Sequence, residues 1–269
     1  MKSKEITIPG FSSDLTPDDR PCLSVFAQEG CGKTRLAATM PDPIGLLALD
    51  KKSKRTMEAV ANEFGKRVIA NSKPFISDKE AISMAMEDDV EKVKKLYAAV
   101  YGRILEDGMK LADHADIASI VVDTNSQLFE YILFSHFGRR TQIKPTSRGA
   151  ANQDMIDFVN ALRSKNVLLI HRAKEVWKST GKTDRSGEAI KEPSGKFESD
   201  GFKNIGGFCT ATLELTNNKK ATSLESKFRV KVQTCQTNSM LEGQDLQDYG
   251  VSGEEITWPN LMTALGIGE

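Results

Sequence analysis

Cys22-Leu-Ser-Val-Phe-Ala27 is a short apolar run, followed by the glycine-rich turn Gln28-Glu-Gly-Cys-Gly-Lys33 and then by Thr34-Arg-Leu-Ala-Ala-Thr-Met40. The run lacks polar–apolar alternation, which is typical of a strand buried on both faces, and Thr34 to Met40 is expected to be helical. Ala27 to Thr34 follow the pattern G-x-x-x-x-G-K-[ST], with Ala in place of the first Gly. The strand–turn–helix context is the one that a phosphate-binding loop requires, so the sequence predicts such a loop.

Each residue type in this turn suits phosphate binding. Gly30 and Gly32 allow the backbone to turn so that successive N–H groups point at phosphate oxygens. Lys33 is expected to reach the β- and γ-phosphates, and the Thr34 hydroxyl to ligate Mg²⁺. Ala27 is tolerated if its position does not need a positive φ. The predicted nucleotide-binding residues are Gly30, Cys31, Gly32, Lys33, Thr34 and Arg35.

A nucleotide loop needs an acidic partner at the end of a buried strand. Asp123 follows the apolar run Ile117-Ala-Ser-Ile-Val-Val122 and is predicted to hold Mg²⁺, directly or through water. The alternative is that Asp123 caps the next helix. Asp50 follows a second run, Ile44-Gly-Leu-Leu-Ala-Leu49, and is a rival for the same role, with helix capping again open.

The order of elements predicts an α/β fold. Further strands are expected at Ile44–Leu49, Val68–Ala70, Ile117–Val122, Val167–Ile170, Thr210–Leu215 and Phe228–Val232. Helices are expected at 55–64, at 78–113 as one helix or two, and at 125–137, 151–164 and 258–265. Buried strands alternating with helices favour a mostly parallel sheet wrapped in helices, which the late strands extend antiparallel. Residues 172–206 are polar with little periodicity.

Composition narrows the class of protein. The chain has 269 residues, 37 Lys+Arg against 37 Asp+Glu, and 39% hydrophobic residues, which excludes collagen, low-complexity disorder and a membrane bundle. Zero net charge excludes binding to nucleic acid through bulk charge. Without a signal peptide or a long apolar run, a cytoplasmic protein is expected. Four scattered cysteines favour neither a zinc site nor disulfides. Residues 1–20 are expected to be an arm before a single domain over 21–269.

Three motifs together resemble a RecA-like NTPase core, and most of all the minimal phage-encoded RecA-type recombination proteins. They are Glu29-Gly-Cys-Gly-Lys-Thr34, Val121-Val-Asp-Thr-Asn-Ser126 and the strand Val167-Leu-Leu-Ile-His171. The resemblance covers residues 20 to 235. It implies a three-layer RecA-like P-loop NTPase core that binds ATP and Mg²⁺ and acts on single-stranded DNA in recombination or strand annealing, in the cytoplasm of a host cell.

The resemblance also implies roles for single residues. Lys33 and Thr34 bind the triphosphate and Mg²⁺, Asp123 is the metal-side acid, and His171 senses the γ-phosphate; the alternative for His171 is a hydrogen-bonded strand-end histidine. Such enzymes carry a Glu after the second strand to orient the attacking water, but here Lys52 lies near that place. Either Asp50 or Glu29 substitutes as the catalytic carboxylate, or hydrolysis is slow.

A polynucleotide site is expected in two segments. Arg139, Arg140, Lys144 and Arg148 lie in a ten-residue stretch without an acid, which suits backbone phosphates, although an ordinary solvated loop is the alternative. In the segment 172–203, Trp177 and Phe197 could stack on unpaired bases or pack a hairpin. The resemblance further implies a ring or filament of identical subunits, and leaves a single-strand-binding protein open as a partner.

Two other functions stay open at this point. One is a small-molecule or nucleotide kinase, with the arginines of 139–148 as its lid. The other is a nucleotide-gated adaptor that binds a partner protein, to which Lys52 lends weight because it predicts ATP binding with negligible turnover.

Overall fold

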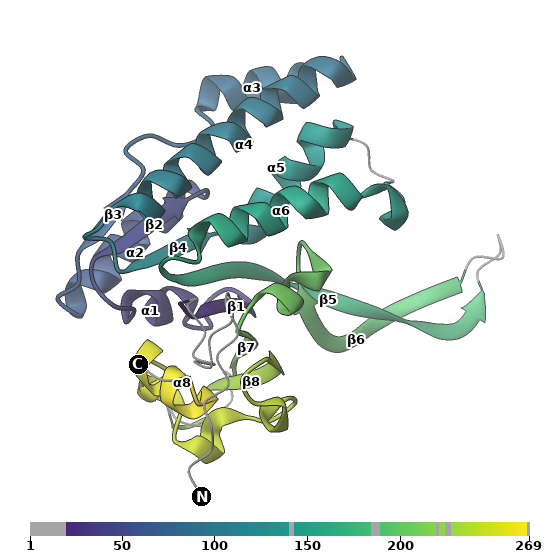
Figure 1. Cartoon of the computed structure of the whole chain (residues 1–269). Helices are drawn as coiled ribbons and strands as arrows, with labels where there is room; N and C mark the ends of the chain where they lie inside the picture. The colour runs from purple at the N-terminus through teal and green to yellow at the C-terminus, as the bar shows by residue number, and fades with distance from the viewer. Residues whose placement is uncertain (1–19, 140–142, 184–188, 219–220, 224–226, 268–269) are drawn as a thin grey trace, which may run out of the picture.

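The computed structural model describes residues 20–139, 143–183, 189–218, 221–223 and 227–267 (Figure 1). The strands are β1 (Cys22–Ala27), β2 (Ile44–Ala48), β3 (Val68–Ala70), β4 (Ser119–Asp123), β5 (Asn166–Thr183), β6 (Ala189–Ser199), β7 (Ala211–Asn217) and β8 (Phe228–Cys235). The helices are α1 (Lys33–Ala38), α2 (Lys51–Glu63), α3 (Asp78–Met86), α4 (Val90–Asp113), α5 (Asn125–Phe137), α6 (Gly149–Leu162) and α8 (Trp258–Leu265). Short 3-10 turns lie at Pro145–Ser147, Lys203–Phe208, Ser239–Leu241, Leu246–Tyr249 and Gly253–Glu255.

The central sheet is mostly parallel. Its strand order is β3-β2-β4-β5-β1-β7-β8, and all neighbours up to β7 run parallel. Within this order only β8 is antiparallel, paired with β7, while β6 lies off the order and pairs antiparallel with β5. The strands β1 and β2 are buried along their whole length, which explains their continuous apolar sequences. The predicted fold class is therefore confirmed, except that β7, the first of the two late strands, joins parallel.

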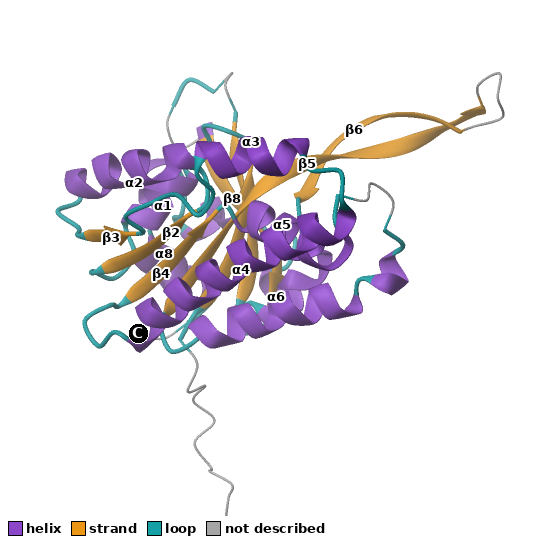
Figure 2. Ribbon diagram, turned by 90° about the horizontal axis from the view of Figure 1, so that it is seen from above, coloured by secondary structure: helices purple, strands orange, loops and turns teal. Residues whose placement is uncertain are grey.

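Helices cover both faces of the sheet and make three layers, as Figures 1 and 2 show. On one face α1, α2 and α8 bury Leu36, Met57 and Leu261 against the strands. On the other face α4, α5 and α6 bury residues such as Leu128 and Phe158. Each face thus has its own apolar core, because a sheet buried on both sides must be covered twice.

The long helical pattern at 78–113 divides into two helices. α3 starts with a capping box in which Ser77 accepts from the Glu80 backbone and the Glu80 side chain accepts from the Ser77 backbone. α4 starts at a second cap, where Asp89 accepts from two backbone N–H groups. The two caps, at Ser77 and at Asp89, fix two separate helix starts.

The segment after His171, where the sequence shows little periodicity and a hairpin is one of the alternatives, consists of two paired strands. β5 continues from the sheet to Thr183 and pairs antiparallel with β6. The two strands form a ribbon that projects from the body of the molecule (Figures 1 and 2). Most ribbon residues beyond Arg172 are exposed or only half buried. Without a core on one side, nothing imposes polar–apolar alternation, which explains why the sequence shows little periodicity over these strands.

Two sequence-based expectations concern parts that the structure describes incompletely. The arm at 1–20 lies outside the described residues except for Arg20, and its separation from one domain over 21–269 stays a prediction. Among the described helices, none is both long and apolar enough to span a membrane.

Candidate nucleotide site

The loop between β1 and α1 has a backbone that only glycine adopts easily at two positions. Gly30 has φ 77° and Gly32 has φ 90°, both in the left-handed region. No described non-glycine residue has a positive φ. Position 27 therefore does not require a glycine, and Ala27 at the first position of the loop pattern causes no backbone strain. The Asn217 amide at the end of β7 donates to the Gly30 carbonyl over 2.9 Å and holds the loop from outside.

Lys33 folds back over this loop. Its Nζ donates to the Ala27 carbonyl at 2.6 Å and to the Gln28 carbonyl at 3.0 Å. Burial lowers the pKa of Lys33, while Cys31, Asp123 and Glu29 act to raise it. The Lys33 ammonium is thus partly shielded from water and hydrogen-bonded to two carbonyl oxygens. A phosphate oxygen that enters the loop can replace these carbonyl oxygens.

Asp123 lies at the carboxyl end of β4, opposite this loop. Its carbonyl accepts from the backbone of Leu49 at 2.7 Å and of Asp50 at 3.4 Å, which ties the ends of β4 and β2 together. Burial raises the pKa of the Asp123 carboxyl, although a hydrogen bond from Ser53 and the charge of Lys33 oppose this. The next residue, Thr124, follows a cis peptide and caps α5 by accepting from Gln127. The capping role considered for Asp123 thus falls to Thr124.

The end of β2 carries the second candidate carboxylate. Asp50 caps α2 and accepts from the Lys52 backbone at 2.9 Å. Asp50 also lines the same cleft as the loop, so capping α2 and a place at the site are compatible. Lys52 lies beside it and lines the hollow as well.

A single cleft joins these residues. It has a volume of about 760 Å³, large enough for a nucleotide. Residues 27–35, Asp50, Asp123 and Thr124 line it, so the predicted residues Glu29, Gly30, Cys31, Gly32, Lys33, Thr34, Arg35 and Asp123 are brought together. The sequence reasoning missed further lining residues, which are Ser53, Thr56, Arg172, Ala173 and Phe228. We call this hollow the nucleotide cleft.

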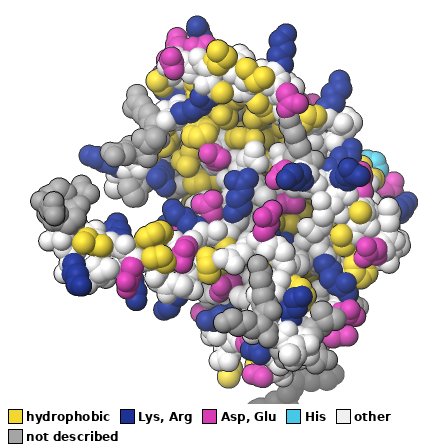
Figure 3. All heavy atoms as spheres, turned by 180° about the vertical axis from the view of Figure 1, so that it is seen from behind, with side chains coloured by type: hydrophobic (Ala, Val, Ile, Leu, Met, Phe, Trp, Pro, Cys, Tyr) yellow, Lys and Arg dark blue, Asp and Glu magenta, His cyan; other side chains and the backbone are white. Residues whose placement is uncertain are grey.

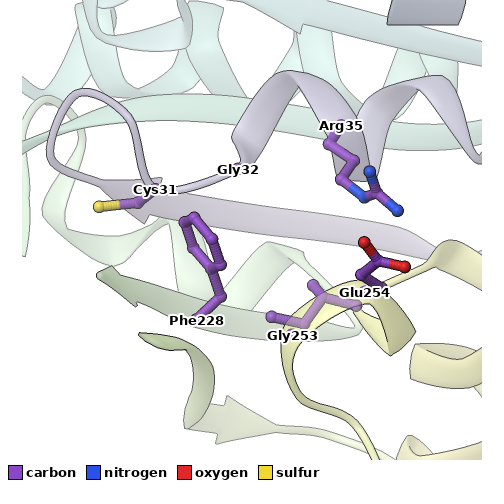
Figure 4. A pocket seen from close by; sticks show the side chains of 7 residues that line it. Cys31, Gly32, Arg35, Phe228, Gly253 and Glu254 are labelled. Atoms are coloured by element: carbon purple, nitrogen blue, oxygen red, sulfur yellow. The ribbon is translucent and has the colours of Figure 1, made fainter. Parts of the chain in front are cut away.

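A smaller pocket of about 100 Å³ lies against the loop on the side of β8 (Figure 4). Phe228 projects from β8 toward Gly32, while Arg35 from α1 and Glu254 face each other farther along. Arg35 also lies over the Phe64 ring at 5.2 Å. Cys31 is 5% exposed and belongs to the apolar core. Its side chain is therefore part of the packing of the loop against the core.

His171 does not reach the nucleotide cleft. The side chain is fully buried, with Nδ1 3.3 Å from the Asp200 carbonyl and Nε2 3.3 Å from the Asn125 amide nitrogen. A carbonyl only accepts, so Nδ1 carries the proton and Nε2 accepts from Asn125. Burial lowers the pKa of His171 to about 4. This geometry fits the alternative of a hydrogen-bonded strand-end histidine, and the next residue, Arg172, lines the cleft instead.

The predicted basic loop lies apart from the nucleotide cleft. Arg139 donates to the Ala85 carbonyl at 3.2 Å, and Arg148 donates to the Ile143 carbonyl within its own loop at 3.2 Å. Lys144 is exposed. Arg140 lies outside the described residues. None of the three described residues lines the cleft.

The comparisons with known proteins do not assign this chain to a family. No family model matches the sequence, and no curated protein matches it. Among solved structures, the chain is similar to one described as a prototypical ATPase from the type III secretion system of pathogenic bacteria. The identity is 9% and the TM-score 0.43, with 92% of this chain and 61% of that chain covered. The match thus spans about three fifths of that protein, and values this low indicate nothing about what this chain binds or does.

Proposed function

We propose that the chain binds ATP with Mg²⁺ in the nucleotide cleft and hydrolyses it as a RecA-like NTPase that acts on single-stranded DNA in recombination or strand annealing. One observation supports this most. A left-handed glycine loop with its lysine, and a half-buried carboxylate at the end of another strand, line one cleft of nucleotide size.

The donor atoms in the cleft suit a metal–triphosphate complex. Loop amides and Lys33 can bind the β- and γ-phosphates once the lysine exchanges its carbonyl partners for phosphate oxygens. Thr34 and Asp123 supply the hydroxyl and carboxylate oxygens that Mg²⁺ prefers. When bound, the metal would neutralise charge on the phosphates.

Hydrolysis requires a water that attacks the γ-phosphorus while the bond to the β–γ bridging oxygen breaks, giving ADP and phosphate. The carboxylates that line the cleft are Glu29, Asp50 and Asp123. Asp50 already accepts from the Lys52 backbone, and a protonated lysine cannot accept a proton from water. We therefore expect slow basal turnover.

The ribbon supports the DNA part of the proposal. Its described residues carry the cations Arg172, Lys174, Lys178, Lys182, Lys191 and Lys196 against Glu175, Glu192 and Glu198. Trp177 is 56% exposed among them, which leaves its ring accessible for stacking on a base. Arg172 lies at the root of the ribbon and lines the nucleotide cleft, so one residue touches both parts.

The family resemblance supports the remaining parts of the proposal. These are a phage origin, a ring or filament of identical subunits in the host cytoplasm, and a single-strand-binding protein as partner. The kinase alternative is weakened because Arg139 and Arg148 do not line the cleft.

The test is ATP turnover of the full chain with and without single-stranded DNA. Lys33→Ala should abolish nucleotide binding and turnover, whereas Lys95→Ala, an exposed lysine on α4, should change neither. Equal turnover in the parent and Lys33→Ala would refute the ATPase. Phosphate transfer to a metabolite would favour a kinase, and tight ATP binding without turnover or DNA binding would favour the adaptor.

A further inference from the structure

A second hollow lies beside the nucleotide cleft. It has a volume of about 660 Å³ and is bounded by α3, α5 and the end of β2. We call it the side groove. It shares Asp50, Lys52 and Arg172 with the nucleotide cleft. Figure 3 shows hydrophobic side chains gathered in a hollow between the upper helices and the projecting ribbon, with Lys and Arg side chains around it.

The floor of the side groove is aromatic. The Tyr97 ring lies 5.6 Å from the Tyr131 ring and 4.9 Å from the Phe134 ring, centroid to centroid. The Gln127 amide donates to the Tyr131 hydroxyl, and burial raises the pKa of Tyr131 to about 12, so the phenol keeps its proton. Tyr97 and Tyr131 are 8% and 7% exposed, so each presents only a small part of its ring to the groove. An apolar floor beside an amide and a neutral phenol suits a planar heterocycle with polar edges, which is the chemistry of a nucleobase.

The rim of the side groove favours phosphate. Three cations line it, Lys52, Arg139 and Arg172, against the carboxylates Asp50 and Glu130. Asp50 is already engaged as the cap of α2. Arg139 gives one N–H to the Ala85 carbonyl, which leaves most of the guanidinium donors for other acceptors.

The position of the two arginines favours a polynucleotide over a single nucleotide. Arg139 is the first residue of the basic loop, and Arg172 begins the ribbon that carries Lys174 and Trp177. The sugar–phosphate backbone of a strand that crosses the side groove from Arg139 to Arg172 therefore continues onto the cationic surface of the ribbon.

We propose that the side groove binds an unpaired base of single-stranded DNA, with flanking phosphates at Arg139 and Arg172. Lys52 and Arg172 line both hollows, so occupancy of the groove is linked to the nucleotide cleft. This inference rests on the proposed function, because it names where its DNA substrate enters.

The experiment fills the groove without touching the nucleotide cleft. Ala81 is exposed on α3 and lines the groove, whereas Ser83 is exposed on the same helix and does not. Ala81→Trp and Ser83→Trp are compared with the parent as full chains. Affinity for a fluorescein-labelled oligothymidylate is measured by anisotropy at fixed salt, alongside ATP turnover and thermal melting.

Ala81→Trp should weaken DNA binding about tenfold, the loss expected for one stacked base. It should also abolish DNA stimulation of turnover, with basal turnover unchanged, and Ser83→Trp should behave as the parent. Equal affinity in all three proteins would overturn the groove site and leave the ATPase standing. An altered oligomeric state with unchanged DNA affinity would assign the groove to a second copy of the chain. A parent that hydrolyses ATP but binds no oligonucleotide would remove the DNA substrate itself.

If Ala81→Trp fails to fold, Gln127→Ala removes the polar edge of the groove instead. Gln153→Ala, on the exposed side of α6, is its control. A loss of DNA affinity in Gln127→Ala alone supports the site, and equal affinity in the two variants overturns it.

Discussion

Acidification should destabilise the protein through His171, and the effect can be worked from its environment. The buried imidazole is neutral, with one ring nitrogen donating to the Asp200 carbonyl and the other accepting from Asn125. Its pKa is about 4, against 6.5 ordinarily. Between these values the unfolded chain binds a proton at His171 that the folded chain does not. The stability from neutral His171 is therefore fully present above pH 6.5 and is lost as the pH falls toward 4.

The size of the loss follows from the two pKa values. At about pH 5, protonation of His171 in the unfolded chain stabilises the unfolded state, and the free energy of unfolding is lower than at neutral pH by about 2 kcal/mol. That is a large share of the stability of an ordinary domain, which is about 5 to 15 kcal/mol. Other groups titrate in the same range, so the parent is compared with His171→Gln, which has no proton to gain.

The assay is urea unfolding of both proteins at several pH values. The difference in unfolding free energy between parent and His171→Gln should shrink by about 2 kcal/mol from neutral pH to about pH 5. Because His171 lies outside the cleft, ATP affinity at neutral pH should be equal in the two proteins. A pH-independent difference, or an imidazole that titrates near 6.5 by NMR in the folded parent, would refute the buried neutral histidine.

Three further perturbations test the site. Gly32→Ala places a side chain at φ 90° and should cost about 1 to 2 kcal/mol in urea unfolding and weaken ATP binding, whereas Gly149→Ala, with open space and no positive φ, should not. The pKa of Asp123 is raised, so Mg²⁺-dependent ATP affinity should be lost on acidification at a higher pH than if an ordinary carboxylate held the metal. Calorimetry on Asp123→Asn should show weak binding that lacks this pH dependence. Trp177→Ala should leave the melting temperature unchanged but weaken oligothymidylate binding at least fivefold by anisotropy, and equal affinity would remove the ribbon from the DNA site.

The conformation of the glycine loop and the place of the carboxylate opposite it could be predicted because their signals are local. Lys33 and Thr34 follow a turn in which glycines are needed for left-handed backbone, and that need is written into adjacent residues. Asp123 ends an apolar run, and in a parallel sheet the carboxyl ends of strands share one edge. The glycine loop and Asp123 were therefore expected at the same edge of the sheet.

The surroundings of the cleft were not predictable in the same way. Arg172 on β5 and Phe228 on β8 line it from positions far along the chain from the glycine loop, and no spacing in the sequence indicates this. Asn217 supports the loop across a long sequence separation, and a lone asparagine at a strand end carries no pattern.

The sequence by itself determined the layered α/β class, the course of the buried strands and the loop at the first of them, because burial and glycine conformations leave periodic or adjacent marks on the chain. Only the tertiary structure decided that His171 is enclosed while Arg172 is presented, that the polar segment beyond them forms a ribbon, and that an aromatic groove opens beside the cleft. These depend on which distant elements pack together, and packing between distant segments is fixed by their shapes in space, which neighbouring residues along the chain do not record.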